Sequence, residues 1–467
     1  MENLKLKLNV KNTVKIGFAF FGILMLWQVY NTYCPIILEA MLKDVLGPDK
    51  PYNYIIGCIM ALDNVAAIII MPLVGIWSDK TKTKYGKRMP YIVIGMAFTT
   101  LVFPFIALMC MWNLFAGVLV FMVLFLIIMQ AYRSPAVAFM PDVTPKPLRS
   151  KANGIINLIG YLGGVFVTLL GFIKALKLDN TSSLAQVQKT VIWPFLICTV
   201  VFVAILFFLA FSIKENKMVE ETKKDVELGE TMSENLEEIK EDNKLSKGDK
   251  RNFILLLLSI FFWFMAFNSF ETFGSLFTKN ILNNSNLYSK MATFLSISSI
   301  ISFVLFSNLS SKIGRKWTIV LGIGLLIASL GAIAIVSLSF VAKGAAELGW
   351  LEYLFFVLSA IMGVGWALIN INSFPMVVEF ANKDNVGKFT SFYYTASMVA
   401  QSITPLLVGL FMDFLEIGQN VLFIYATILM IVALVIFMFI VESKATKERL
   451  KKKSKKSTLE MLGDMDN

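Results

Sequence analysis

Apolar residues fill the chain in long runs, and short polar segments separate one run from the next. A helix of about 20 apolar residues is long enough to cross the hydrocarbon core of a bilayer, and each run approaches or exceeds that length. The pattern predicts an all-α membrane protein with twelve transmembrane helices, built as two pseudo-symmetric six-helix bundles. The predicted spans are 14–37, 53–77, 91–112, 114–140, 152–173, 191–213, 252–278, 287–308, 317–341, 351–378, 387–412 and 419–441.

The distribution of basic residues predicts how these spans are oriented. With the N-terminus in the cytoplasm, 34 of the 43 Lys and Arg residues fall in cytoplasmic segments and only 8 fall in external ones. Cytoplasmic loops of membrane proteins carry this kind of excess. We therefore expect a multi-pass protein of the cell membrane with both termini in the cytoplasm. The net charge of +11 reflects this topology, so no nucleic-acid partner is expected.

A charged segment between the sixth and seventh spans divides the chain. Residues 214–251 are dense in Glu and Lys and nearly free of aromatic residues, which is typical of a solvated linker with some helical tendency. The predicted organisation is a six-helix bundle over 1–213, this cytoplasmic linker, a second six-helix bundle over 252–441 and a basic cytoplasmic tail over 442–467. The tail is expected to rest on the anionic headgroups of the lipid bilayer.

The residue content narrows the chemistry. The chain has no histidine, so a side chain that handles a proton must be a carboxyl group or, less readily, Lys or Tyr. Its four cysteines lie inside apolar runs without paired spacing, which favours packing over a disulfide or metal site. The sequence shows no nucleotide motif and no nucleophile with an adjacent base, so we expect no enzyme, no cofactor and no metal. The first apolar run is too long for a signal-peptide core and is expected to be a retained span.

The two halves show weak internal similarity. Tyr30-Asn31-Thr32-Tyr33 in the first span returns as Phe267-Asn268-Ser269-Phe270 in the seventh, 237 residues later, and the same offset carries Asp142 onto Glu379. The basic loop after the second span is echoed in a shorter form by Ser311 to Lys316. Duplicated bundles of this kind are typical of transporters.

The loop after the second span holds the most specific motif. It reads Gly75-Ile76-Trp77-Ser78-Asp79 and, after a basic stretch, Gly86-Lys87-Arg88-Met89-Pro90. This resembles the loop 2–3 signature of the major facilitator superfamily, with four extra residues between the aspartate and the second glycine. Together with Pro135 to Asp142 and Phe270-Glu271-Thr272, the longer loop resembles the sucrose transporter branch and its glycoside-pentoside-hexuronide cation symporter relatives.

This resemblance implies a secondary active transporter that works by alternating access. The implied partners are a small-molecule solute, most readily a glycoside such as an α-glucoside disaccharide, and a coupling cation, with a proton favoured over sodium. A sodium-coupled carrier or an exporter of another small solute stays open as an alternative. A membrane sensor that has lost transport is a further alternative, from a different class of function.

Ionisable residues within spans are the best candidates for coupling, because each costs roughly 2.5–3.5 kcal/mol at a helix centre and persists only with a partner or a wet cavity. Asp63, near the middle of the second span, and Glu271, in the seventh, are expected to bind the coupling cation. Arg133 lies within the fourth span and Asp142 at its end, beyond a break expected at Pro135. These two are expected to take part in a buried charge switch, with Asp63 as another candidate partner of the guanidinium.

The loops that carry the superfamily motif are expected to gate the cytoplasmic side. Asp79 should meet the N-terminus of the eleventh span near Lys388, where a helix dipole favours an anion. The shorter loop has Ser311 where an acid is expected. The predicted gating residues are Gly75, Asp79, Gly86, Lys87, Arg88, Gly314, Arg315, Lys316 and Glu379.

Sugars are recognised by polar side chains that bond hydroxyl groups and by aromatic faces that stack on the ring. Amide side chains at mid-span depth are the stronger candidates, since an unsatisfied amide is costly in lipid. The predicted solute-binding residues are Gln28, Tyr30, Asn31, Asn157, Asn268, Trp366, Asn370, Asn372 and Gln401, with Trp27 and Tyr161 as further candidates.

Overall fold

The protein is known from a computed structural model that describes residues 6, 8–47, 50–237, 247–306, 309–344, 348–380 and 386–441. The predicted basic tail, 442–467, lies outside the described residues. Twelve helices within them are long and apolar enough to cross a membrane, which confirms the predicted all-α fold and number of spans.

The spanning helices are α1 (Val10–Leu46), α2 (Asn53–Lys80), α3 (Met89–Met111), α4 (Phe115–Asp142), α5 (Arg149–Leu169), α6 (Leu184–Ser212), α8 (Lys247–Asn280), α9 (Ser285–Leu305), α11 (Arg315–Ala342), α12 (Leu351–Val378), α13 (Val386–Phe414) and α14 (Val421–Met438). Between them lie α7 (Glu215–Glu237), α10 (Leu309–Ile313) and the single 3-10 turns η1 (Lys146–Leu148), η2 (Leu170–Phe172), η3 (Lys174–Leu176) and η5 (Gly418–Asn420).

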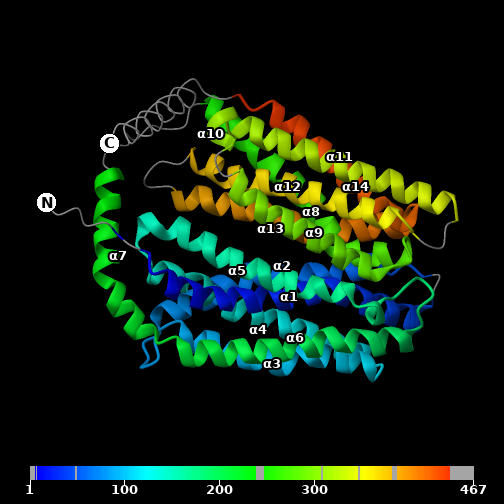
Figure 1. Ribbon diagram of the computed structural model, residues 1–467, viewed down its shortest axis with the longest axis horizontal. Coiled ribbons are helices and arrows are strands. Elements are labelled where there is room, and N and C mark those ends of the chain that lie inside the picture. Colours follow the sequence, from blue (N-terminus) through cyan, green and yellow to red (C-terminus); the bar gives the residue numbers. More distant parts are fainter. Residues whose placement is uncertain are drawn as a thin grey trace.

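The spans pack as two bundles with the same internal arrangement. In the first half α1 lies against α5 and α6, α3 against α4 and α6, and α2 against α4. In the second half α8 lies against α13 and α14, α11 against α12 and α14, and α9 against α12. Figure 1 shows the first six spans in the lower part of the molecule and the last six in the upper part. The halves meet where α2 packs on α13, α5 on α9 and α1 on α8.

The two ends of the bundle differ. We call the end where α2 leads into α3 and where α7 lies the linker end, and the opposite end, where α1 leads into α2, the far end. Figure 1 shows α7 running across the linker end, roughly at right angles to the spans. Its inner face packs at η1, where a Cβ on Gly229 would come within 2.8 Å of the Pro145 side chain.

Prolines inside the spans do not interrupt them. The break expected at Pro135 is absent, because α4 runs unbroken from Phe115 to Asp142, and α12 likewise continues through Pro375. Neighbouring helices and side chains can satisfy the backbone groups that proline frees in a membrane helix. Beside Pro135, the Ser134 hydroxyl also ties α4 to α2, since it donates to the Met71 carbonyl at 2.7 Å.

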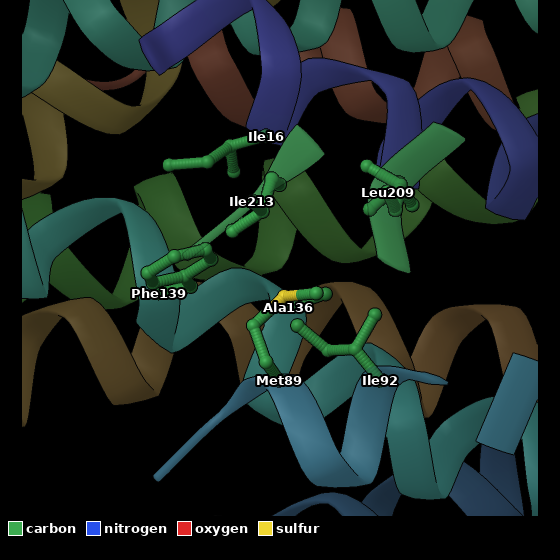
Figure 2. A pocket seen from close by; sticks show the side chains of 8 residues that line it. Ile16, Met89, Ile92, Ala136, Phe139, Leu209 and Ile213 are labelled. Carbon is green, nitrogen blue, oxygen red and sulfur yellow. The ribbon is translucent and has the colours of Figure 1, made fainter. Parts of the chain in front are cut away.

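Side chains fill the first bundle near its linker end. Figure 2 shows a small apolar gap between α1, α3, α4 and α6, with Ile16, Phe139 and Leu209 among its lining side chains. The gap leaves no room for a water molecule, and only apolar side chains face it. A gap of this kind belongs to the packed core and is no place for a polar solute.

Candidate functional site

A carboxyl group and a guanidinium act on each other electrostatically in the middle of the first bundle. Asp63 of α2 is 5% exposed, and its Oδ1 accepts a hydrogen bond from Gln130 Nε2 of α4 at 3.1 Å. Arg133 lies one helical turn after Gln130, so both side chains leave α4 on the same side. Its guanidinium acts electrostatically on Asp63 and lies 5.4 Å from the ring centre of Trp27 on α1. Three helices therefore contribute to one charged cluster.

The second carboxyl group reaches this cluster from the other bundle. Glu271 of α8 is half-buried, and its charge acts on that of Asp63 across the boundary between the halves. Asn268 lies beside it, one turn earlier on the same helix. The charge of Glu271 also acts on the phenol of Tyr161 on α5. The charges of Arg133 and Glu271 thus both act on Asp63, although Asp63 and Glu271 are 208 residues apart in the sequence.

Several predicted solute-binding residues lie on α1 and α5, the helices that bring Trp27 and Tyr161 near these charges. Gln28 donates to Thr32 Oγ1 at 3.2 Å and lies near the Tyr288 phenol of α9, across the boundary between the halves. Tyr30 is 1% exposed beside Asp63, and its hydroxyl has no hydrogen-bond partner within the described residues. Asn31 is half-buried on the following position, and Asn157 is exposed one turn before Tyr161 on α5. These side chains provide the amides and phenols that sugar hydroxyls require.

The candidates from the second bundle are mostly engaged in their own helices. The Asn370 amide donates to Trp366 O at 2.8 Å, that of Asn372 to Leu368 O at 2.8 Å, and that of Gln401 to Ser397 O at 3.2 Å. Asn372 is 1% exposed, so it serves helix packing. Trp366 stacks on Phe267 with a centroid distance of 3.8 Å. Asn370, Gln401 and Trp366 keep some exposed surface.

The motif loop between α2 and α3 folds around Arg88. The guanidinium donates to Asp142 Oδ2 at 2.8 Å, to the Ser78 hydroxyl and to Asp79. Lys87 Nζ lies 3.1 Å from the same Asp142 oxygen. Asp79 therefore binds within its own half rather than to the first turn of α13, and 60% of its side chain is exposed. Gly75 lets α4 approach α2, since a Cβ there would lie 3.0 Å from Ser134 Oγ.

A residue of the linker completes this loop. Glu215, the first residue of α7, is 1% exposed, and its carboxylate accepts from the backbone N–H groups of Lys87 at 3.0 Å, Arg88 at 2.9 Å and Met89 at 2.8 Å. These are the free donors at the start of α3, where the helix dipole favours an anion. Gly86 has φ +111°, and a Cβ there would lie 2.1 Å from the Glu215 carboxylate. Only glycine fits this position.

The second half repeats the arrangement in a reduced form. Gly314, with φ +86°, precedes α11, and Arg315 at the start of that helix bonds Glu379 just after α12. Asp142 and Glu379 are thus equivalent acids that bind an arginine at the start of equivalent spans. Lys316 differs, because its Nζ donates to Met438 O at 3.1 Å and Ile440 O at 2.6 Å, at the end of α14. A cation there complements the helix dipole.

Arg133 and Asp142 do not come together. They are nine residues apart on one continuous helix, which is about 13 Å along its axis. Asp142 reaches the linker end and binds Arg88 and Lys87, whereas Arg133 stays at the depth of Trp27 and Asp63. The two residues belong to separate charge clusters, and Asp63 is the acid whose charge acts on the guanidinium.

Sequence reasoning missed a buried ion pair at the far end. Glu39 of α1 and Lys279 of α8 lie 2.8 Å apart, and both side chains are at least 96% buried. The predicted spans ended at residues 37 and 278, just before them, so both appeared to lie in external loops. In the structure α1 and α8 continue to Leu46 and Asn280. Gln130 and Tyr288 were also missed, although a polar side chain in mid-span was a usable signal for Gln130.

Comparisons with known proteins agree with this architecture. A solved D-xylose-proton symporter superposes with a TM-score of 0.66 at 13% identity, covering 92% of this chain and 98% of that one, which shows a shared fold. Lactose permease of Leuconostoc lactis is 32% identical over 153 residues, 31% of this chain and 23% of that protein. The sucrose transport protein SUC3 of Arabidopsis thaliana is 48% identical over 31 residues, 7% of this chain and 5% of that protein.

The matched segments of both relatives are therefore short, and this chain spans less than a quarter of either protein's length. The sequence pattern of one family, by contrast, covers nearly the whole chain, over residues 16–351 and 344–464. That match agrees with the twelve spans and with the motif loop around Arg88. The chain is a membrane carrier rather than an enzyme, and it belongs to the Major Facilitator Superfamily.

Proposed function

We propose that this carrier imports a glycoside, such as an α-glucoside disaccharide, together with a proton. The observation that carries the proposal is the cluster of Asp63, Arg133 and Glu271 at mid-membrane depth between the two halves. One carboxyl group comes from each bundle, so a cation bound between them acts on both halves at once. Such a group of ionisable side chains inside a membrane is a mark of a proton or ion pathway.

The cluster supplies a coupling step. While Asp63 is ionised, it attracts Arg133 and accepts the Gln130 hydrogen bond. A proton on Asp63 removes that attraction, and the guanidinium then needs another acceptor. Sugar hydroxyls and ring oxygens can act as acceptors, and Trp27 beside Arg133 offers an aromatic face for the ring. In this scheme a proton and a solute favour each other's binding, which is what symport requires.

The surrounding side chains fit an uncharged polar solute. Gln28, Asn157, Asn268 and Tyr161 provide donors and acceptors around the charged cluster, and Asn31 lies on the same span as Gln28. Two proteins that match short segments of this chain, a lactose permease and a sucrose transport protein, are named for sugars. We assign Asn372 to helix packing and leave it out of the solute site, because its side chain is buried and bonds its own helix.

We orient the carrier by the excess of basic residues at the linker end, which supports placing that end in the cytoplasm. At the far end the halves are joined by Asn53 and Tyr54 on Asp413, at 2.7–3.1 Å, and by Asn286 on Ile173 O at 2.9 Å. A carrier closed at the external end is in the state from which an imported solute leaves to the cytoplasm. The motif loops around Arg88 and Arg315 are expected to act when that side closes.

Uptake into proteoliposomes tests the proposal. The purified carrier is reconstituted, a pH gradient is imposed with and without sodium, and a panel of mono- and disaccharides is offered. We expect concentrative uptake of at least one glycoside under the pH gradient alone, abolished by a protonophore. Accumulation that follows the sodium gradient would favour sodium coupling, and no accumulation of any sugar under either gradient would contradict the proposal.

A further inference from the structure

The ion pair of Glu39 and Lys279 crosses the boundary between the halves. Lys279 Nζ lies 2.8 Å from Glu39 Oε2, and the two side chains are 4% and 0% exposed. A buried ion pair is stable only when close geometry and further hydrogen bonds offset the loss of hydration. Because Glu39 is on α1 and Lys279 on α8, this pair exists only while the far ends of the two bundles are together.

A chain of amides continues the connection. The Asn280 amide donates to Glu39 Oε1 at 2.5 Å and to Gln419 Oε1 at 3.0 Å. Gln419 donates to Asn53 Oδ1 at 3.0 Å, and Asn53 donates to Asp413 Oδ1 at 2.7 Å. We call these six side chains, Glu39, Lys279, Asn280, Gln419, Asn53 and Asp413, the far-end latch. Each bond from Asn280 to Glu39, Gln419 to Asn53 and Asn53 to Asp413 joins one half to the other.

Glu39 is the centre of the latch. Besides Lys279 and Asn280 it accepts from Lys43 at 2.9 Å and from the Tyr52 hydroxyl at 3.3 Å. Lys279, by contrast, has only Glu39 and the Asn280 side-chain oxygen, at 3.2 Å, as bonding partners in the described part of the chain. Loss of Glu39 would leave the Lys279 ammonium buried without a counter-charge, whereas Glu39 would keep Lys43 if Lys279 were removed.

A small pocket at the far end lies between the latch and the outer solution. A pocket of about 340 Å³ at the far end is lined by Lys43, Tyr52, Asn53, Asn280 and Gln419, together with residues of the loops beside them. Three of these are members of the latch. A solute that arrives from the far end therefore meets the latch before it reaches the charged cluster around Asp63.

We propose that the far-end latch sets the balance between the externally closed and externally open states, with Glu39–Lys279 as its main contact. This inference rests on the proposed alternating access, since only such a cycle opens the far end. In the closed state the pair is buried, and in the open state both side chains reach water. Removing one partner therefore disfavours the closed state far more than the open one and shifts the population outward.

Ser275 offers a reporter for that shift. It lies one helical turn before Lys279 and one after Glu271 on the same side of α8, between the latch and the charged cluster. It is 0% exposed, so a cysteine there reacts only when the far end opens. The native cysteines Cys34, Cys110 and Cys198 are buried and Cys58 is exposed, so Ser275→Cys is placed in a Cys58→Ser background.

The experiment measures how fast a membrane-impermeant maleimide labels the Ser275→Cys reporter. Each variant is first shown to be monodisperse after purification and is then reconstituted into liposomes. We expect Glu39→Gln to raise the labelling rate at least tenfold, Lys279→Gln less, and the milder Asn280→Ala two- to fivefold. The double variant Glu39→Gln/Lys279→Gln should label no faster than Glu39→Gln, because the same contact is already lost. Glu352→Gln is the matched control, since its ion pair with Lys290 joins α9 and α12 within one half, and it should leave the rate unchanged.

The outcomes separate the latch from the proposed function. Unchanged labelling in Glu39→Gln, Lys279→Gln and Asn280→Ala would overturn the latch, and so would multiplied effects in the double variant or an equal rise in Glu352→Gln. Sugar uptake by the unsubstituted carrier is measured in parallel. If labelling rises as expected and that carrier moves no sugar, the latch stands and the proposed function fails.

Discussion

Removing the Glu215 carboxylate should loosen the start of α3. In Glu215→Ala the backbone N–H groups of Lys87, Arg88 and Met89 lose their common acceptor, and all four bonds of 2.8–3.1 Å disappear. The same change removes the anion that complements the positive end of α3. The neighbouring Arg88 guanidinium keeps Asp142 and Asp79, so the damage should be confined to the backbone of the loop.

The size of the effect follows from the number of donors. A hydrogen bond to a charged group contributes about 1.5–3 kcal/mol, so three donors would set an upper range of about 4.5–9 kcal/mol. Lys84 and Tyr85 in the same loop are exposed, so water can replace part of the lost bonding. We therefore expect about 1 kcal/mol per donor, or about 3 kcal/mol in all. For a bundle of roughly 200 residues this lowers the melting temperature by roughly 6–12 °C.

A thiol-reactive fluorogenic dye measures this change in a Cys58→Ser background, because the remaining Cys34, Cys110 and Cys198 are buried and react only on unfolding. Glu221→Ala is the control, since within the described residues Glu221 makes only an exposed pair of 3.8 Å with Lys217 on the same helix. It should shift the melting temperature by less than about 2 °C, as exposed helix pairs contribute only about 0.3–0.5 kcal/mol. If Glu215→Ala melts within about 2 °C of the unsubstituted protein, the carboxylate does not hold the start of α3 and our reasoning is refuted.

Three other outcomes follow from the same contacts. Gly86→Ala should lower the melting temperature as Glu215→Ala does, because the new Cβ would clash with the Glu215 carboxylate. Gly154→Ala is the control and should leave the melting temperature unchanged, since no atom lies within 4 Å of its Cβ position. Additive effects in the double variant Gly86→Ala/Glu215→Ala would argue against a direct clash. Gly57→Ala should separate α2 from α13, because its Cβ would lie 2.1 Å from Pro405 O; an unchanged distance between spin labels on the two far ends would contradict this. Arg133→Gln should fold normally but lose concentrative sugar uptake, and normal accumulation would remove the guanidinium from the mechanism.

The fold was accessible from the sequence because burial in lipid leaves a strong local signal. The length of an apolar run of about 20 residues is enough to predict a span, and all twelve spans were predicted in this way. The ends of the spans were less accessible. α1 and α8 extend beyond their apolar runs and include Glu39 and Lys279, which neutralise each other across the halves. A pairing between residues 240 positions apart leaves no trace in either run taken alone.

The candidate site likewise contains residues that the sequence pattern reveals and residues that only the fold reveals. Asp63, Arg133 and Glu271 stood out as ionisable residues within apolar runs, and the structure brings their charges together. The partner of Asp142 could not be foreseen from helix spacing, because Arg88 and Lys87 approach it from the next loop of the fold. Glu215 was hidden in a segment of many similar charges, and only its place at the start of α3 distinguishes it. Asn372 had the right type and depth for solute binding but bonds its own helix.

The central claim, that carboxyl groups of Asp63 and Glu271, one from each half, couple the proton to the solute, has one most direct test. Asp63→Asn and Glu271→Gln keep size and hydrogen bonding but cannot ionise. In proteoliposomes under a pH gradient, we predict that both variants lose uphill sugar accumulation, while Asp44→Asn, a change of an exposed acid at the end of α1, keeps it. Exchange of sugar between equal concentrations should persist in at least one of them, which shows an intact carrier. If both variants still concentrate the sugar as the unsubstituted protein does, the coupling assignment is wrong.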